Sequence, residues 1–253
     1  MLFSKPGEYE ACGIFTADHF FLLIISIIGI IIALRKSRKM NKEQIKSTII
    51  STTILLWILE IIKIIFNFII GNIKSPNNYI PLYFCSLILY AGLFSGFGKG
   101  KLKHVGDVFI ATGGIVAGVC FLLFPITSLT IYPVFHFISI QSFILHSCMV
   151  YLGLLVNIRK YVVIKKQDFK YYFALIVIIS ILAYIFNCIF DSNLMFISKN
   201  YPGTPIETIY NLTGNAYTFV AIIAQATIPF YLILFIKKLL FTEPSVAQVR
   251  QLP

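Results

Sequence analysis

Seven long apolar runs restrict the fold of this chain more than any other feature of its sequence. A helix that crosses a bilayer needs about 20 mostly apolar residues. Runs of that kind lie at about 17–34, 48–70, 79–96, 106–124, 133–156, 171–190 and 214–236. They are too long for strands, and none alternates as a membrane barrel does. The sequence therefore predicts an all-α bundle of seven transmembrane helices over residues 1–240 as a single domain, with a short tail at 241–253.

The composition excludes a soluble enzyme. Only 12% of the 253 residues are charged, whereas soluble domains carry about 25%. The five cysteines stand far apart, without the paired spacing of a zinc site or a disulfide framework; they are Cys12, Cys85, Cys120, Cys148 and Cys188. We therefore expect neither a metal nor a cofactor.

The basic residues indicate an orientation. The net charge of +11 would suggest nucleic acid in a soluble protein, but here the basic residues gather in alternate connections. Of 21 Lys and Arg, 17 flank the first, third and fifth connections or follow the last run, against Lys5, Lys74 and Lys199 on the other side. Cytoplasmic loops of membrane proteins carry such an excess. We predict a multi-pass protein of the cell membrane, with its N-terminus outside, its C-terminus in the cytoplasm and no nucleic-acid partner.

Polar residues inside the apolar runs are expensive in hydrocarbon and each needs a partner or a purpose. Glu60 and Lys63 are three residues apart on one predicted helix, so they can pair with each other. Such a pair either fixes helix packing or binds a lipid headgroup or zwitterion. The other polar groups at or near membrane depth include His19, Gln141, His146, Asn187, Asn193 and Gln225.

Cys85 and His146 are the candidates for chemistry. Pro81 suits the first turn of a helix, which would place Cys85 just inside the outer end of the third span. There it is either an inert buried thiol or a thiolate favoured by the helix dipole. His146 lies about 13 residues into the fifth span, near the midplane by helix rise. It is either a helix-packing hydrogen-bonder or a general base.

Several segments resemble the YwaF family of bacterial integral membrane proteins. Pro81-Leu-Tyr-Phe-Cys85 is similar to its P-L-H-x-C segment, and Phe143-Ile-Leu-His146-Ser to its F-x-x-H-G stretch. Asn187, followed by Asp191-Ser-Asn193-Leu-Met-Phe196, resembles its N-Y-M-F signature at the end of a span, and the segment around His19 resembles the start of its first span. The resemblance covers about residues 15–236. This chain has Tyr83, Ser147 and Leu194 where that family usually has His, Gly and Tyr.

The YwaF family is similar to the transmembrane protein 164 group of acyltransferases, and this resemblance implies an activity. An acyl group would pass from a membrane phospholipid to a lysophospholipid through a thioester, with Cys85 as the nucleophile and His146 as its base. Asn187 and Asn193 would be supporting polar groups. The alternative is a non-enzymatic membrane protein that binds or transports a lipid or small molecule. Glu60, Lys63, Gln141 and Gln225 would then line a polar chamber.

Overall fold

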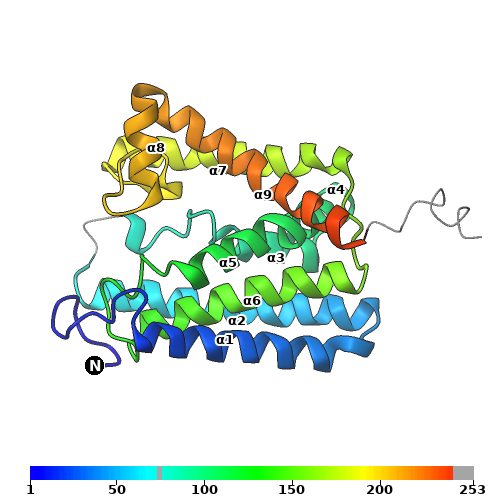
Figure 1. Ribbon diagram of the computed structural model, residues 1–253, viewed down its shortest axis with the longest axis horizontal. Helices are drawn as coiled ribbons and strands as arrows, with labels where there is room; N and C mark the ends of the chain where they lie inside the picture. The colour runs from blue at the N-terminus through cyan, green and yellow to red at the C-terminus, as the bar shows by residue number, and fades with distance from the viewer. Residues whose placement is uncertain (73–75, 242–253) are drawn as a thin grey trace, which may run out of the picture.

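Long helices that run between two ends of a bundle form most of the molecule. The structure is a computed structural model that describes residues 1–72 and 76–241, and it contains no strand within them. The predicted tail after Phe241, like Lys74 of the charge count, lies outside the described residues. The α-helices are α1 (Ala17–Lys36), α2 (Lys42–Ile69), α3 (Leu87–Phe97), α4 (Gly100–Phe109), α5 (Ile115–Leu123), α6 (Phe137–Ile158), α7 (Phe169–Phe190), α8 (Pro205–Thr213) and α9 (Tyr217–Phe241) (Figure 1).

Six helical segments of the described chain are long and apolar enough to cross a membrane. They are α1, α2, α6, α7, the α8–α9 segment, and α4 with α5, which a π-helical turn at Ile110–Gly114 joins into one span. Polar side chains define where two of these helices begin. The Thr16 hydroxyl accepts a hydrogen bond from the His19 amide, and Asn41 forms a capping box with Gln44. Such caps satisfy amides that lack a partner in the first turn.

The third predicted span differs from the expectation. Its helix, α3, has 11 residues, which is about 16 Å of helix against a hydrocarbon core of about 30 Å. Residues 79–86 are not helical, so the prediction that Pro81 occupies a first helical turn is wrong. The backbone polar groups of such a segment are tolerated at membrane depth only where protein or a water-filled cavity surrounds them. Residues 79–85 are accordingly half-buried, and Ser86 is buried.

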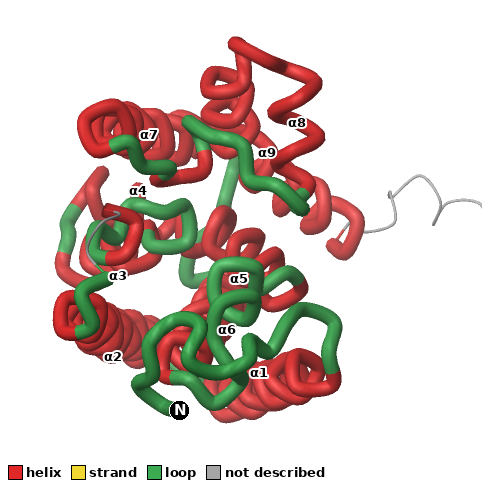
Figure 2. Tube along the Cα trace, turned by 90° about the vertical axis from the view of Figure 1, so that its left-hand side faces the viewer, coloured by secondary structure: helices red, strands yellow, loops and turns green. Residues whose placement is uncertain are grey.

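The helices pack around two central spans. The windows of α4–α5 and α6 are mostly buried, whereas those of the other long spans mostly face outward. Viewed along the bundle in Figure 2, α1 and α2 lie on one side of α5 and α6, and α7 and α9 lie on the other. α5 and α6 cross closely at Gly118. A Cβ at this position would lie only 2.8 Å from the His146 carbonyl oxygen, so the approach requires glycine. This approach brings α5 directly against His146.

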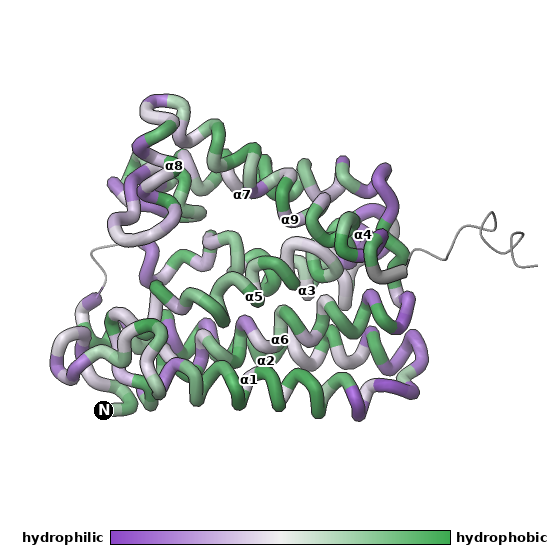
Figure 3. The backbone as a smooth tube through the Cα atoms, in the orientation of Figure 1, coloured by the Kyte–Doolittle hydropathy of each residue, from purple (hydrophilic) through white to green (hydrophobic). Residues whose placement is uncertain are grey.

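Hydropathy divides the molecule along its length. The helices are apolar through their middles and polar residues gather towards their ends, as Figure 3 shows. The connections 37–41, 98–99 and 159–168 lie together at the end that we call the basic end, because most Lys and Arg of the described chain flank them. Residues 1–16 and the connections 124–136 and 191–216 lie at the opposite end. The outer faces of α1 and α2 expose many large apolar side chains, as a lipid-facing surface does.

Candidate functional site

A buried ion pair lies between α2 and α6. The Lys63 Nζ is 2.5 Å from a Glu60 carboxylate oxygen, and the Glu60 side chain is 1% exposed. Across the helix interface, the Gln141 side-chain amide donates to the other Glu60 oxygen at 3.3 Å. The predicted pairing of Glu60 with Lys63 is thus confirmed, and Gln141 joins it. Because a carboxylate at this depth is costly without a partner, both contacts stabilise its charged form.

His146 is held in one tautomer. Its Nδ1 lies 2.7 Å from the Ser142 carbonyl oxygen, to which it can only donate a proton. The Nε2 atom is therefore the acceptor, and it is buried without a hydrogen-bond partner within the described residues. The ring stacks on Phe121 of α5, with centroids 3.6 Å apart and planes 8° apart. The imidazole is consequently fixed in orientation, with an unused basic nitrogen.

Cys85 lies at the entrance to α3, two residues before its first helical residue, and it is half-buried. It stands twelve residues before Phe97, the end of α3, and His146 stands twelve residues before Ile158, the end of α6. Helix rise places both about 18 Å from the basic end. Counted from the basic end, the two residues therefore lie at similar depths, whereas the sequence suggested a shallow Cys85 and a deep His146.

Lys63 connects the two candidate residues electrostatically. Its charge lies close enough to act on both the Cys85 thiol and the His146 imidazole. The positive end of the α3 dipole also lies next to Cys85. The ion pair, Gln141, His146 and Cys85 therefore make up one region of the bundle interior, which we call the polar cluster.

Asn187, Asn193 and Gln225 belong to a second region, around the loop at 191–199. The Asn187 side chain donates to the Leu194 carbonyl and the Ser198 hydroxyl, and accepts from Ser192 and from the Leu194 amide. Asn193 likewise accepts from two loop amides and donates to the Lys199 carbonyl. These two side chains hold the loop in shape.

Gln225, on α9, reaches the same loop from outside it. Its amide donates to the Met195 carbonyl at 3.0 Å, while its Oε1 is buried without a partner in the described chain. It is therefore the member of this second region with an unused polar atom.

His19 lies outside both regions. Its Nδ1 accepts from the Phe15 amide and its Nε2 contacts the Leu122 carbonyl oxygen at 3.0 Å, so both ring nitrogens are occupied. This side chain ties the start of α1 to the end of α5. The rings of Phe143 and Phe121 lie between it and His146.

Tyr83 is a further candidate residue that spacing arguments did not single out. Its ring lies 5.2 Å from that of Phe196, and Phe196 lies 5.2 Å from Tyr201. Tyr83 also lies within electrostatic range of Cys85 and Glu60. It therefore links the 191–199 loop to the polar cluster. The only signal in the sequence was its replacement of the usual histidine in the Pro81–Cys85 segment.

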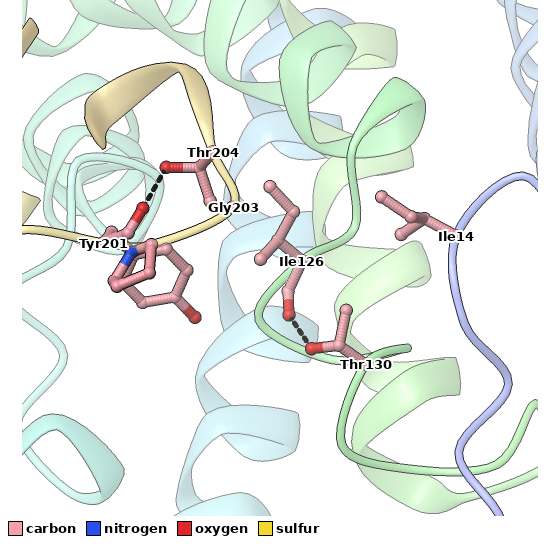
Figure 4. A pocket seen from close by; sticks show the side chains of 7 residues that line it. Ile14, Ile126, Thr130, Tyr201, Gly203 and Thr204 are labelled. Carbon is pink, nitrogen blue, oxygen red and sulfur yellow. Dashed lines mark hydrogen bonds between the residues drawn. The ribbon is translucent and has the colours of Figure 1, made fainter. Parts of the chain in front are cut away.

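A pocket of about 300 Å³ opens at the end opposite the basic end. It is formed by the N-terminal segment, the connection after α5 and the loop before α8, and Figure 4 shows its side chains. The lining residues are Ile14, Ile126, Thr130, Tyr201, Pro202, Gly203 and Thr204. Thr130 donates to the Ile126 carbonyl and Thr204 to the Tyr201 carbonyl. Burial raises the pKa of Tyr201 above its usual value, so this phenol is a neutral hydrogen-bond donor at neutral pH.

The fold and these polar contacts define a class: a multi-pass helical membrane protein with an ionised cluster inside its bundle. Among the described residues, no group of three or more His, Cys, Asp or Glu side chains is placed to hold a metal ion. The model of the TMEM164 family matches residues 14–237, and the chain belongs to this family. Neither a curated protein nor a solved structure matches the chain in the comparisons.

Proposed function

We propose that this protein is a membrane phospholipid acyltransferase with Cys85 as the nucleophile and His146 as the general base. The observation that carries the proposal is the state of His146. Its Nδ1 proton is committed to the Ser142 carbonyl, which leaves a buried and unpartnered Nε2 as the proton acceptor. Membership of the TMEM164 family is compatible with this class of activity, and the resemblance to the YwaF family supports the same pair of residues.

In the proposed reaction, His146 Nε2 takes the thiol proton as the Cys85 sulfur attacks the ester carbonyl of a phospholipid. Collapse of the tetrahedral intermediate breaks the ester bond, and the lysophospholipid alkoxide leaves with the proton from His146. A thioester remains on Cys85. The hydroxyl of a lysophospholipid acceptor then attacks it, with His146 again moving the proton, and the free thiol returns.

Lys63 is suited to an electrostatic role in this scheme. Negative charge develops first on sulfur and then on the carbonyl oxygen, and fixed positive charge in a site of low dielectric stabilises both. Glu60 pairs with the Lys63 ammonium on α2, and Gln141 of α6 donates to the Glu60 carboxylate. The apolar surroundings favour transfer to a lipid hydroxyl over hydrolysis by water. We further propose a cell-membrane location, with the basic end in the cytoplasm.

The direct test is intact-mass analysis of protein incubated with phospholipid in liposomes. We expect an acyl-sized mass increase that hydroxylamine removes and that is absent in the Cys85→Ala variant. Cys148→Ala is the matched control, because Cys148 is also half-buried, lies two residues from His146 and should retain the adduct. Unchanged acyl exchange by Cys85→Ala would contradict the nucleophile assignment.

The second candidate function is non-enzymatic binding or transport of a lipid or small molecule. The buried Glu60–Lys63 pair favours it, because paired opposite charges inside a bundle suit a zwitterionic ligand. In this case a Cys85→Ser variant would retain a tightly bound lipid while the wild-type protein shows no hydroxylamine-sensitive adduct.

A further inference from the structure

The pocket at the end opposite the basic end combines apolar and hydroxyl-bearing side chains. None of the described side chains that line it is charged. Large apolar side chains lie exposed nearby: Phe15, next to Ile14, is 56% exposed, and Phe124, two residues before Ile126, is 48% exposed. A molecule in this pocket would therefore meet polar atoms inside it and an apolar surface beside it.

Aromatic rings lead from this pocket towards Cys85. Tyr201 lines the pocket, and its ring lies 5.2 Å from that of Phe196. Phe196 lies 5.2 Å from Tyr83, which precedes Cys85 by two residues. Tyr83 is close enough to interact electrostatically with both Tyr201 and Cys85. The three neighbouring rings thus lead from the pocket to the segment that carries the candidate nucleophile, and we call them the aromatic path.

The middle ring of the path is fixed by an unfavourable backbone. Met195 and Phe196 have φ values of 58° and 54°, in the left-handed region that is unfavourable for residues other than glycine. Side chains from outside the loop hold this conformation. The Tyr217 hydroxyl donates to the Phe196 carbonyl, and Gln225 donates to the Met195 carbonyl. A strained segment that its surroundings over-determine is typical of functional sites.

We propose that this pocket is the entry subsite for a membrane glycerophospholipid, which the aromatic path guides to Cys85. The inference deepens the proposed function and rests on it for the reaction at Cys85. The headgroup would occupy the pocket, with the acyl chains against the exposed apolar surface. The carboxylate of Glu207 accepts from the Gly203 amide at 2.9 Å, beside the pocket. It would repel a net anionic headgroup, so a zwitterionic headgroup fits this site better.

The test measures lipid binding separately from chemistry. Full-length protein with Cys85→Ala, reconstituted in nanodiscs, is irradiated with a zwitterionic lysophospholipid that carries a photoreactive group in its headgroup. We expect crosslinks to peptides that contain residues 126–130 and 201–204. Adding Thr130→Trp, which places an indole in the pocket, should lower crosslinking about tenfold.

Two control variants separate filling of the pocket from other effects. Ile131→Trp places the same side chain on the neighbouring exposed residue, which does not line the pocket, and should crosslink normally. Thr130→Val removes the hydroxyl bond to Ile126 without filling the pocket, so it should lower crosslinking less than Thr130→Trp does.

The outcomes distinguish this proposal from the acyltransferase assignment. Crosslinking that Thr130→Trp abolishes supports the pocket, even where the wild-type protein forms no acyl adduct and the acyltransferase assignment fails. Equal crosslinking by Thr130→Trp and Ile131→Trp, or crosslinks that map away from both loops, would overturn the proposal. Preference for an anionic over a zwitterionic probe would also overturn its charge argument.

Discussion

At the scale of single residues, the function of a polar side chain depends on which of its atoms remain unused. Asn187 and His19 use their side-chain polar groups in fixed hydrogen bonds, so they stabilise a loop and a helix junction. His146 keeps Nε2 free, and Gln225 keeps Oε1 free. The sequence placed all four at membrane depth or near it, but it could not tell these two states apart, because the hydrogen bonds depend on the folded shape of the loop at 191–199 and on packing between helices.

The Glu60–Lys63 pair leads to a prediction about stability. Glu60→Ala leaves an ammonium inside the bundle, and breaking a buried pair in this way costs about 3–5 kcal/mol. We expect the low end, about 3 kcal/mol, because the Lys63 side chain is 19% exposed. Unfolding in detergent micelles measures the change. The Glu60→Ala/Lys63→Met double variant should lose less than Glu60→Ala alone, and a larger loss would show that the pair is not the source.

At the scale of elements, the third span determines the depth of the candidate nucleophile. An uninterrupted helix over 79–96 would separate Cys85 from residue 79 by only about 9 Å of helix rise, whereas non-helical residues can cover up to about 3.3 Å each. The observed α3 begins only at Leu87. The apolar run was visible in the sequence, but hydropathy does not distinguish a helix from a non-helical segment that neighbouring helices surround. Non-helical backbone is tolerated at this position because the surrounding protein buries it.

Another element, α6, predicts a dependence on pH. His136 caps it: Nδ1 accepts from the Ile138 amide and Nε2 donates to the Ser4 carbonyl, so the neutral ring is required. Burial lowers the pKa of His136 in the folded state. The unfolded chain then binds the proton more readily, so stability should fall as pH decreases below about 6.5. Each unit of pKa difference is worth about 1.4 kcal/mol.

Thermal unfolding in micelles between pH 7.5 and pH 5 measures this effect. His136→Asn retains a capping side chain but does not titrate in this range, so its stability should vary less with pH. An equally steep pH dependence in that variant would assign the effect to other groups.

At the scale of the whole molecule, the arrangement of charge predicts orientation and the number of crossings. The basic connections lie at one end of the described bundle, as the sequence predicted, although six rather than seven helical segments are long enough to span a membrane. Residues 79–97, a non-helical segment followed by α3, lead from the end opposite the basic end back to it. They would provide the seventh crossing.

Reporter fusions test this topology. Alkaline phosphatase, which is active only outside the cytoplasm, should be active when fused after residue 72 and inactive after residue 98. Fusions after residues 127 and 160 should be active and inactive respectively, and they serve as controls on spans with full-length helices. Activity after both 72 and 98 would mean that residues 79–97 do not cross the membrane.

The sequence by itself determined the class of this protein. Apolar run length and the placement of basic residues are local properties that the bilayer enforces, so helices, membrane location and the two ends of the bundle followed from them. Only the tertiary structure decided which polar groups meet. The Gln141–Glu60 contact, the stacking of His146 on Phe121 and the aromatic path to Cys85 all join distant segments. Side-chain packing between helices sets these contacts, and a single sequence contains no direct signal for it.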